Sequence, residues 1–519
     1  MRRNASRGLA LTGALALPIA LLATPAAGEP VLDDAPGLSV PGITSDNVEL
    51  VGTVPDEAMV STAISRDSEV LYANTLTGIT TYDISEPERP SILGHLPMAF
   101  FQNENVNLGE RDDGTKFILI GFDQFGVTPT FTPGEVGVRD EIAVVDVSDP
   151  ANPFITARVE TSTRTHTVSC IDPECSYAYT SGDTDPEGEP AFSIINLANH
   201  TQPFEEAVHP SSVGPLGHDW HIDDAGIAWH SGLEGTVAYD ISDPLDPQVL
   251  NSTDEAGLEG GEFNRFIHHN VVRPHAEDFG TQPGRSGDAP GQGGPTHPIG
   301  PEEPNLRDGN VLLVTEEVLW DDPISCDEQG DFQTWQIDEL AGTGEGAIEP
   351  GTGTIRPLDR YEPEFQGTGE QAPAGVFCSA HYFTYHQDGF VAQGFYQQGF
   401  RLLDVRDPAD ITQVGFYVTG EQEVWGAQWV PERDADGHVT GEMSELVYVK
   451  DATRGLDVLR VELPDTPPAD TEALPEPEAL LSPLLVSPAL DQKKRGGGDH
   501  DHGGLGDGVD GADGEDHGH

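Results

Sequence analysis

Four histidines recur at spacings that suit one repeated unit, and their side chains can bind a metal. His166, His218, His269 and His381 are separated by 52, 51 and 112 residues. Neutral imidazole is the commonest protein ligand for ions such as Zn, Cu and Fe. Three or four imidazoles around one ion leave a coordination position open for a substrate. These residues therefore predict one transition-metal site, provided that the fold brings them together.

Other side chains near these four are further candidates for the site. The nearby alternates are His221, His268 and His386. Cys378 precedes the last of the four histidines by three residues. Carboxylates usually orient ligand imidazoles from behind, and Asp219 and Asp223 are the nearest in sequence. The chain has no Gly-x-Ser-x-Gly, His-Glu-x-x-His or P-loop motif, so common hydrolase and nucleotide sites have no support.

A short phrase recurs seven times along the chain, as a hydrophobic strand followed by a turn. It reads Thr-Tyr-Asp-Ile-Ser-Glu-Pro at residues 81–87 and Val-Val-Asp-Val-Ser-Asp-Pro at residues 144–150. The other copies begin at Ile194, Ala238, Thr334, Leu402 and Val458. Repetition at this spacing is typical of repeat architectures such as propellers.

The first unit divides into four short strands, which is the pattern of a propeller blade. Its expected strands are residues 60–65, 69–74, 79–84 and 91–96. Six further units follow the same order, so we expect an all-β fold, a seven-bladed β-propeller. The seventh unit lacks a fourth strand, and residues 48–54 match the missing pattern. This N-terminal strand is therefore expected to complete the last blade and close the ring.

The four histidines begin the innermost strands of four consecutive units, and such strands surround the axis of a propeller. The other three units have Thr62, Asn105 and Ala427 at this position. In the alternative interpretation the imidazoles brace the blades through hydrogen bonds to the backbone. A bracing feature of the repeat should recur in every unit, so this asymmetry strengthens the metal interpretation, while bracing remains the commoner role for such residues. Trp425 and Trp429 are candidates to face the channel and stack on a ligand.

The repeated strand and its Asp-Pro turn resemble the LVIVD repeat of secreted and cell-surface β-propellers. The turns recur in register at Asp149-Pro150, Asp243-Pro244 and Asp407-Pro408, whereas units three, five and seven lack them. The resemblance covers residues 48–463. It implies an extracellular propeller and no common reaction.

The ends of the chain differ in composition from the repeats. Three Arg, an apolar stretch at residues 9–22 and Ala26-Ala27-Gly28 are typical of a cleaved export signal. We expect a signal peptide at 1–28, a linker at 29–47, the propeller at 48–464 and a disordered tail at 465–519, first acidic and Pro-rich, then rich in His, Asp and Gly.

Cysteines and charge place the protein outside the cytoplasm. Cys170 and Cys175 flank a tight reversal and are expected to pair, which leaves Cys326 and Cys378 for each other or free. The net charge is −65, and only four residues are Lys. This excludes a basic nucleic-acid-binding face. No later segment is apolar enough to span a membrane.

These features predict a secreted or cell-surface monomer that acts as an extracellular binding or interaction module. Its partner would be an extracellular protein, a polysaccharide or a small molecule. The alternative is a metal-dependent enzyme, possibly an oxidoreductase, with its histidines at the propeller axis and one Zn, Cu or Fe ion as cofactor.

Overall fold

A computed structural model describes the repeats and leaves the predicted signal peptide and tail outside the described residues. The described residues are 43–55, 59–75, 77–98, 104–122, 140–182, 184–253, 263–279, 303–318, 329–340, 355–363, 377–420 and 422–464. They belong to one compact unit that begins at Gly42. Apart from two short 3-10 helices, η1 (Ala276–Asp278) and η2 (Leu306–Asp308), the regular structure of this part of the chain is all strand.

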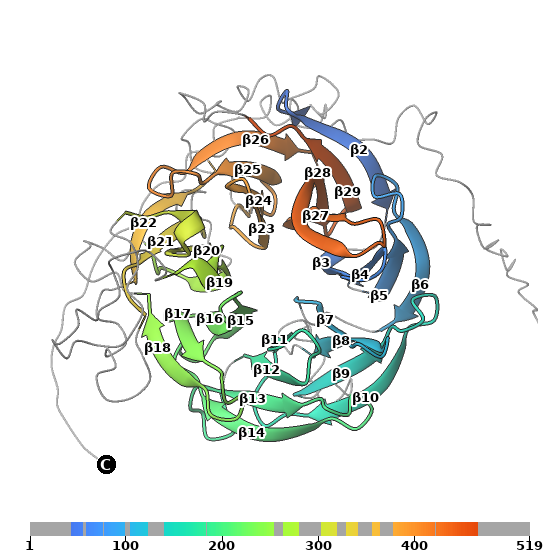
Figure 1. Ribbon diagram of the computed structural model, residues 1–519, viewed down its shortest axis with the longest axis vertical. Helices are drawn as coiled ribbons and strands as arrows, with labels where there is room; N and C mark the ends of the chain where they lie inside the picture. Colours follow the sequence, from blue (N-terminus) through green and yellow to red (C-terminus); the bar gives the residue numbers. More distant parts are fainter. Residues whose placement is uncertain are drawn as a thin grey trace, which may run out of the picture. The chain divides into compact units, whose positions relative to one another are not determined.

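Seven antiparallel sheets are arranged around a common axis, as the sequence predicted (Figure 1). Blades one to four are formed by β3(Met59–Ile64), β4(Val70–Thr75), β5(Gly78–Asp83) and β6(Ser91–Pro97); β7(Asn107–Glu110), β8(Lys116–Gly121), β9(Glu141–Asp146) and β10(Phe154–Glu160); β11(Thr167–Cys170), β12(Tyr177–Ser181), β13(Ala191–Asn196) and β14(Phe204–Pro210); and β15(Gly217–Ile222), β16(Ile227–Gly232), β17(Gly235–Asp240) and β18(Gln248–Ser252).

The remaining three blades complete the circle, and the first strand of each blade lies innermost (Figure 1). They are formed by β19(Ile267–Val272), β20(Val311–Glu317), β21(Phe332–Ile337) and β22(Ile355–Tyr361); β23(Phe383–His386), β24(Phe390–Gly394), β25(Phe400–Asp404) and β26(Thr412–Val418) with β1(Ile43–Thr44); and β27(Val424–Arg433), β28(Val439–Asp451) and β29(Gly455–Val461) with β2(Val48–Pro55).

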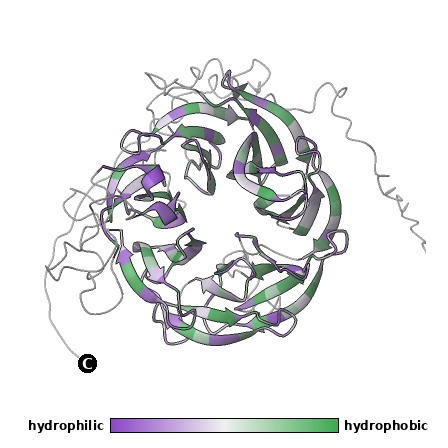
Figure 2. Ribbon diagram, in the orientation of Figure 1, coloured by the Kyte–Doolittle hydropathy of each residue, from purple (hydrophilic) through white to green (hydrophobic). Residues whose placement is uncertain are grey.

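Hydrophobic patterning explains the layering of each blade. Middle strands such as β9 are buried along almost their whole length, and their sequences are near-continuous apolar runs. Outer strands such as β14 alternate between exposed and half-buried residues, which is the period-two pattern of a strand with one face in solvent. Figure 2 shows hydrophobic and hydrophilic residues interspersed along these strands. The apolar clusters join side chains of neighbouring blades, so the core lies between the sheets.

The repeated Asp of the phrase stabilises the turn that follows it. The side chains of Asp83, Asp146 and Asp240 each accept a hydrogen bond from the backbone N–H two residues later, at 2.8 Å, 2.9 Å and 2.9 Å. An Asp that bonds its own backbone in this way holds a turn without help from other elements. The recurrence of Asp therefore has a local physical cause.

The repeated Pro links each blade to the blade before it. The carbonyl oxygens of Pro87, Pro150, Pro244 and Pro408 accept hydrogen bonds from Tyr448, Thr81, Tyr179 and Thr334 in the preceding blades. The distances are 2.8 Å, 2.5 Å, 2.8 Å and 2.6 Å in that order. The bond to Pro87 joins blade seven to blade one. The phrase thus specifies the contacts between blades as well as the turns within them.

The N-terminal strand completes the last blade, as predicted. β2 pairs antiparallel with β29 from Val48 opposite Val461 to Pro55 opposite Gly455. The Thr53 hydroxyl also donates to the Asp457 carboxylate at 2.6 Å. Without β2, the outer edge of β29 would expose unpaired backbone groups.

One part of the expected linker is ordered. Residues 29–47 were expected to connect without regular structure, but Ile43 and Thr44 form β1 and pair with Val418 and Tyr417 at the edge of blade six. The Ser45 N–H continues this pairing with the carbonyl of Phe416, at 3.1 Å. Two residues are too short for a strand pattern to be recognised in the sequence. The N-terminal segment therefore bonds to blades six and seven in succession.

The disulfide between Cys170 and Cys175 is confirmed, and it closes the turn between β11 and β12. Cys378 is also disulfide-bonded, whereas Cys326 lies outside the described residues.

The turn that begins at Asp434 is the polar tip of the β27–β28 hairpin. Its Asp-Ala-Asp-Gly sequence has some likeness to a calcium loop, but here the Asp434 carboxylate accepts hydrogen bonds from the backbone N–H groups of Asp436 and His438. Within the described ranges, no helix is both long and apolar enough to cross a membrane.

Deleting residues 43–55 should open the ring and destabilise the protein. The deletion removes β1 and β2 and leaves the edge of β29 unpaired. We expect a large fall in the thermal midpoint and concentration-dependent association, measured by circular dichroism and size-exclusion chromatography. Deleting residues 1–42 is the matched control and should leave both unchanged. Equal behaviour of the two deletions would contradict closure by β2.

The buried His230 should make the fold sensitive to acid. Its ring stacks on Trp220 at 3.9 Å and bonds the Ser181 hydroxyl at 2.6 Å, and burial lowers its pKa from 6.5 to about 3. Below pH 6.5 the unfolded chain binds a proton that the folded chain does not, so stability falls by about 1.4 kcal/mol per pH unit. Between pH 7.5 and 5.0 the variant His230→Gln should lose about 2 kcal/mol less than the wild type in urea titrations. Equal losses would show that His230 does not carry this effect.

Candidate metal centre

The four predicted histidines converge on the axis. His166 directly precedes β11, His218 and His269 lie in β15 and β19, and His381 precedes β23. Successive rings are neighbours, with centroid separations of 4.4 Å, 3.9 Å and 4.0 Å around the ring. Adjacent inner strands in a closed ring direct their first side chains to the same place, which explains why residues about 50 positions apart meet.

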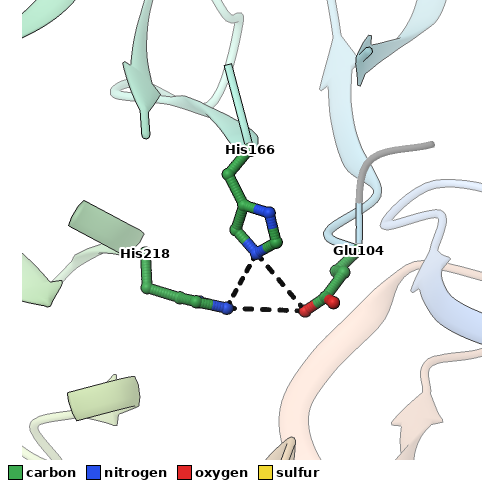
Figure 3. A group of neighbouring side chains, drawn as sticks. All are labelled: Glu104, His166 and His218. Atoms are coloured by element: carbon green, nitrogen blue, oxygen red, sulfur yellow. Dashed lines mark hydrogen bonds and ion pairs between the residues drawn. The ribbon is translucent and has the colours of Figure 1, made fainter. Parts of the chain in front are cut away.

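Glu104 lies at the centre of this group, and the sequence analysis missed it. Its Oε2 atom is 3.6 Å, 3.5 Å, 3.5 Å and 3.4 Å from the Nε2 atoms of His166, His218, His269 and His381. Figure 3 shows Glu104 reaching from blade two toward the first two imidazoles. Alignment of the inner strands pointed to Asn105 in that blade, which is the residue directly after Glu104.

A second carboxylate, Glu317, also borders the imidazoles, and the sequence did not reveal it. It is the last residue of β20, and its oxygens are 4.0 Å from His218, 3.8 Å from His269 and 3.8 Å from His381. The phenol of Tyr396 donates to Glu317 at 2.5 Å. Tyr396 has a positive φ of 32°, a conformation that costs a non-glycine residue energy and is often found at functional sites.

Several polar atoms of the centre are buried without a hydrogen-bond partner. They are Glu104 Oε2, His218 Nδ1, both ring nitrogens of His269, and His381 Nε2. His269 is fully buried. Buried polar atoms in folded proteins are nearly always paired, and each exception needs an explanation. A cation bound between these lone pairs would satisfy Glu104, His269 and His381 together.

Burial favours the neutral form of two of the imidazoles, which is the form that binds metals. Burial, together with the charge of His166, lowers the pKa of His218 to about 4. Burial also holds the pKa of His269 well below its usual value. For Glu104, burial opposes ionisation, but the charge of His166 and the closeness of the other imidazoles outweigh it and hold the pKa well below its ordinary range. Metal ligands of these types must be deprotonated, so the centre is prepared for a cation.

The distances fit a five-donor site after a small contraction. Ligand atoms at adjacent corners of an octahedron lie about 3 Å apart when the metal bonds are about 2.1 Å long. The oxygen of Glu104 is 3.4–3.6 Å from all four nitrogens, and His166 Nε2 is 2.9 Å from His218 Nε2. Glu104 and the four imidazoles are therefore the residues that would hold a metal ion here. Cys378 adds no thiolate, because it is disulfide-bonded.

Hydrogen bonds behind the imidazoles orient only part of the centre. The Nδ1 atom of His381 is 2.5 Å from the carbonyl oxygen of Trp425, which fixes Nε2 as the free lone pair, and the Trp425 ring lies 4.9 Å from this imidazole. Trp425 therefore borders the centre, whereas Trp429 is buried in the core between blades six and seven. A backbone carbonyl performs the role that was expected of a carboxylate.

A second polar layer lies next to the centre. Asn105 donates to the Asp219 carboxylate at 2.7 Å, and burial raises the pKa of Asp219 to about 7. The ring of Tyr382 lies 4.6 Å from His269 and 4.7 Å from His381. Asp219 therefore bonds the residue after Glu104 and not an imidazole. Asp223, the other carboxylate that was expected to orient an imidazole, instead accepts hydrogen bonds from Arg273 and Trp229, each at 2.9 Å.

The three alternate histidines lie outside the cluster. Among the described residues, the groups with metal-ligand spacing contain only the four predicted histidines, Glu104 and Glu317. His268 is bonded through both ring nitrogens, to Thr236 and Phe263. His386 packs on Trp429 at 4.8 Å. The acidic neighbours of His221 are Asp223 and Asp224.

Removing the central donors should abolish metal binding. In protein truncated after Pro464, which removes the His-rich tail, we expect one tightly held metal per chain by elemental analysis. His218→Ala and His269→Ala should lose it, and Glu104→Gln should weaken metal affinity by about tenfold or more because an anionic ligand becomes neutral. His438→Ala, on the exposed hairpin tip, is the control and should keep the metal. Retention of the metal by the double variant His218→Ala/His269→Ala would refute the site.

Comparisons with known proteins add likeness in fold. No protein-family model matches the chain, and no curated protein matches it. The β-propeller domain of Cps50 (Swd1) from Myceliophteria thermophila is a similar solved structure, with a TM-score of 0.47, 10% identity, and coverage of 80% of this chain and 100% of that one. Hydrazine synthase from Kuenenia stuttgartiensis has a TM-score of 0.43, 11% identity, and coverage of 80% and 96%. Identities this low carry no assignment of activity.

Proposed function

We propose that the chain is an exported metal-dependent oxidoreductase with one transition-metal ion at the propeller axis. One observation carries this proposal: a buried carboxylate oxygen of Glu104 lies within 3.4–3.6 Å of four imidazole nitrogens. Such a group of lone pairs is electrostatically costly unless a cation lies among them. A structural role of the imidazoles leaves these unpaired atoms without an explanation.

The donor set supports a redox metal over zinc. Structural zinc sites are usually four-coordinate, and catalytic ones usually have three protein ligands and a water. Here four imidazoles and one carboxylate are available, a set that suits Fe or Cu and geometries of five or six ligands. A bound Fe or Cu ion would supply one-electron chemistry to a substrate in its open position.

The chain's own residues would position the substrate and hold protons at this centre. Glu317 borders three imidazoles at 3.8–4.0 Å, farther than Glu104, and it is held by the phenol of Tyr396. Burial raises the pKa of Glu317 to about 7. Together with the Trp425 ring, these groups form one side of the centre, where a small molecule can be oriented next to the ion.

Export is part of the proposal and has support of its own. The disulfide between Cys170 and Cys175 and the bonded state of Cys378 fit an oxidising compartment. The N-terminal residues have the pattern of a cleaved signal. The acidic composition keeps an exported protein soluble and limits its self-association.

A binding or interaction module is the general function that the propeller fold supports. A rigid ring offers broad surfaces for a partner, and the exposed apolar residues of the outer strands, such as Phe154 and Phe204, are scattered over several blades. Single exposed apolar residues are common on protein surfaces and mark no particular partner. The metal centre is therefore the better-supported function.

Metal selectivity and redox cycling test this proposal. Protein truncated after Pro464 should be stripped of metal and offered Fe(II), Cu(II), Mn(II) and Zn(II) in equal amounts. We expect Fe or Cu to be retained at one ion per chain, and to be reduced and reoxidised reversibly in a spectroscopic titration monitored by electron paramagnetic resonance. Exclusive retention of Zn(II) would contradict the redox assignment. Retention of no metal would leave the binding module as the function.

A further inference from the structure

Lys450 is a buried cation close to the axis, with no carboxylate to pair with among the described residues. It lies near the end of β28 in blade seven and is 5% exposed. Its ammonium group lies over the face of Tyr382, 5.6 Å from the ring centroid. The same part of the chain gives this ammonium no salt bridge and no hydrogen bond. The sequence has only four lysines, so a buried one is not a chance result of a basic composition.

The inner strand of blade seven leaves room for this lysine to approach the axis. Gly426 in β27 pairs with Lys450 in β28, and the lysine side chain passes over it. A Cβ atom at Gly426 would be 2.9 Å from Lys450 Cε and 3.0 Å from Nζ. The same Cβ would be 2.7 Å from Tyr382 Cβ. Any other residue at 426 would therefore displace the lysine or the tyrosine. The absence of a side chain at this position allows the ammonium group to reach Tyr382.

Tyr382 places the ammonium group near the metal centre. Its backbone N–H donates to the Trp425 carbonyl at 3.1 Å, and the Ala427 N–H donates to the Tyr382 carbonyl at 3.4 Å, so blades six and seven are joined here. Its ring lies 4.6 Å from His269 and 4.7 Å from His381. Lys450 is thus separated from two proposed ligands by one aromatic ring.

Two other cations with little exposure have carboxylate partners, since buried Arg273 pairs with Asp223 at 2.9 Å and half-buried Lys116 pairs with Glu110 at 3.3 Å. Arg401 is also buried, and its guanidinium donates to the backbone carbonyls of Gln398 and Phe400. Lys450 differs from all three, because no hydrogen bond or salt bridge reaches its ammonium within the described ranges. An unpaired buried ammonium is costly, and such groups are usually retained for a functional reason. Burial lowers the pKa of Lys450 to about 8, so most molecules still carry the charge at neutral pH.

We propose that Lys450 binds the carboxylate of an anionic substrate whose reacting end lies at the metal centre. The inference rests on the proposed function and names the substrate class. In a strongly acidic chain, an anionic small molecule needs a local positive charge to be held, and the ammonium and the metal ion would supply two. A single ammonium suits a carboxylate, whereas phosphates usually gather several basic donors. Cation–π contact with Tyr382 keeps the ammonium group in place while the anion is absent.

Dicarboxylates of increasing length, each paired with its monoamide, test the proposal. Malonate, succinate, glutarate and adipate are titrated calorimetrically into protein truncated after Pro464, with its metal content measured beforehand. One carboxylate would bind the metal and the other Lys450, so one length should be preferred. For that length the dicarboxylate should bind about tenfold more tightly than the monoamide, or more, because a charged hydrogen bond is lost in the amide.

Variants at position 450 decide whether the lysine carries this preference. Lys450→Met keeps the length of the side chain and removes its charge, so the preference for the dicarboxylate should disappear while the metal content stays unchanged. Lys450→Arg should retain most of the preference. Lys116→Met, which removes a lysine paired in blade two, is the control and should keep all of it.

The two proposals can fail separately. Absence of metal from the wild type would refute the metal centre; on that protein, equal binding of the monoamides by the wild type and by Lys450→Met would refute the role of Lys450 on its own. On metal-containing protein, an undiminished preference in Lys450→Met, or equal binding of dicarboxylate and monoamide by the wild type, would refute the role of Lys450. Trapping of an aldehyde probe, succinic semialdehyde, on Lys450 by borohydride without any carboxylate preference would also refute it, because the lysine would then act as a nucleophile.

Discussion

Closure of the ring is the constraint on which the rest of the structure depends. Each blade alone would be a small sheet with two exposed edges, and its inner strand would point at solvent. The pairing of β2 with β29 fixes the circle, and the bonds from one blade to the proline carbonyl of the next set the angle between neighbours. Only a closed circle directs four inner strands at one point. The cluster of histidines and carboxylates is therefore a property of the ring, since no single blade contains more than a small part of it.

The groups at the axis and the chain as a whole differ in charge, and burial of the axial groups is the reason. The chain as a whole is strongly acidic, yet four imidazoles, two carboxylates and the ammonium of Lys450 gather near the axis. Removal from water raises the cost of every charge there, which lowers the pKa of His218 and raises that of Glu317. The same low-dielectric surroundings strengthen any interaction with a bound cation or anion. An acidic chain can thus enclose a candidate site for both.

The repeat and the site use the sequence in different ways. Turn residues recur because every blade needs the same local hydrogen bonds, as with Asp146 and Ser148. Site residues break the repeat, because each blade presents a different group to one shared point. Blade two contributes Glu104 to the cluster, and blades three to six contribute the histidines. Blade seven contributes Lys450, whose side chain lies next to Gly426. Departure from the repeat strengthened the metal interpretation against a bracing role. Glu104 and Glu317 also occupy positions that do not repeat, and the sequence did not reveal them.

The sequence alone determined the seven blades, closure by residues 48–54, the Cys170–Cys175 bond and the convergence of the four histidines, because periodic patterning and turn chemistry are local. Only the tertiary structure decided that Glu104 lies among the imidazoles, that Glu317 joins them from a second strand, and that Ile43 and Thr44 add a strand to blade six. These contacts join residues far apart in the chain and at positions that do not repeat. No spacing or composition encodes such contacts, since they depend on how neighbouring sheets are packed around the axis.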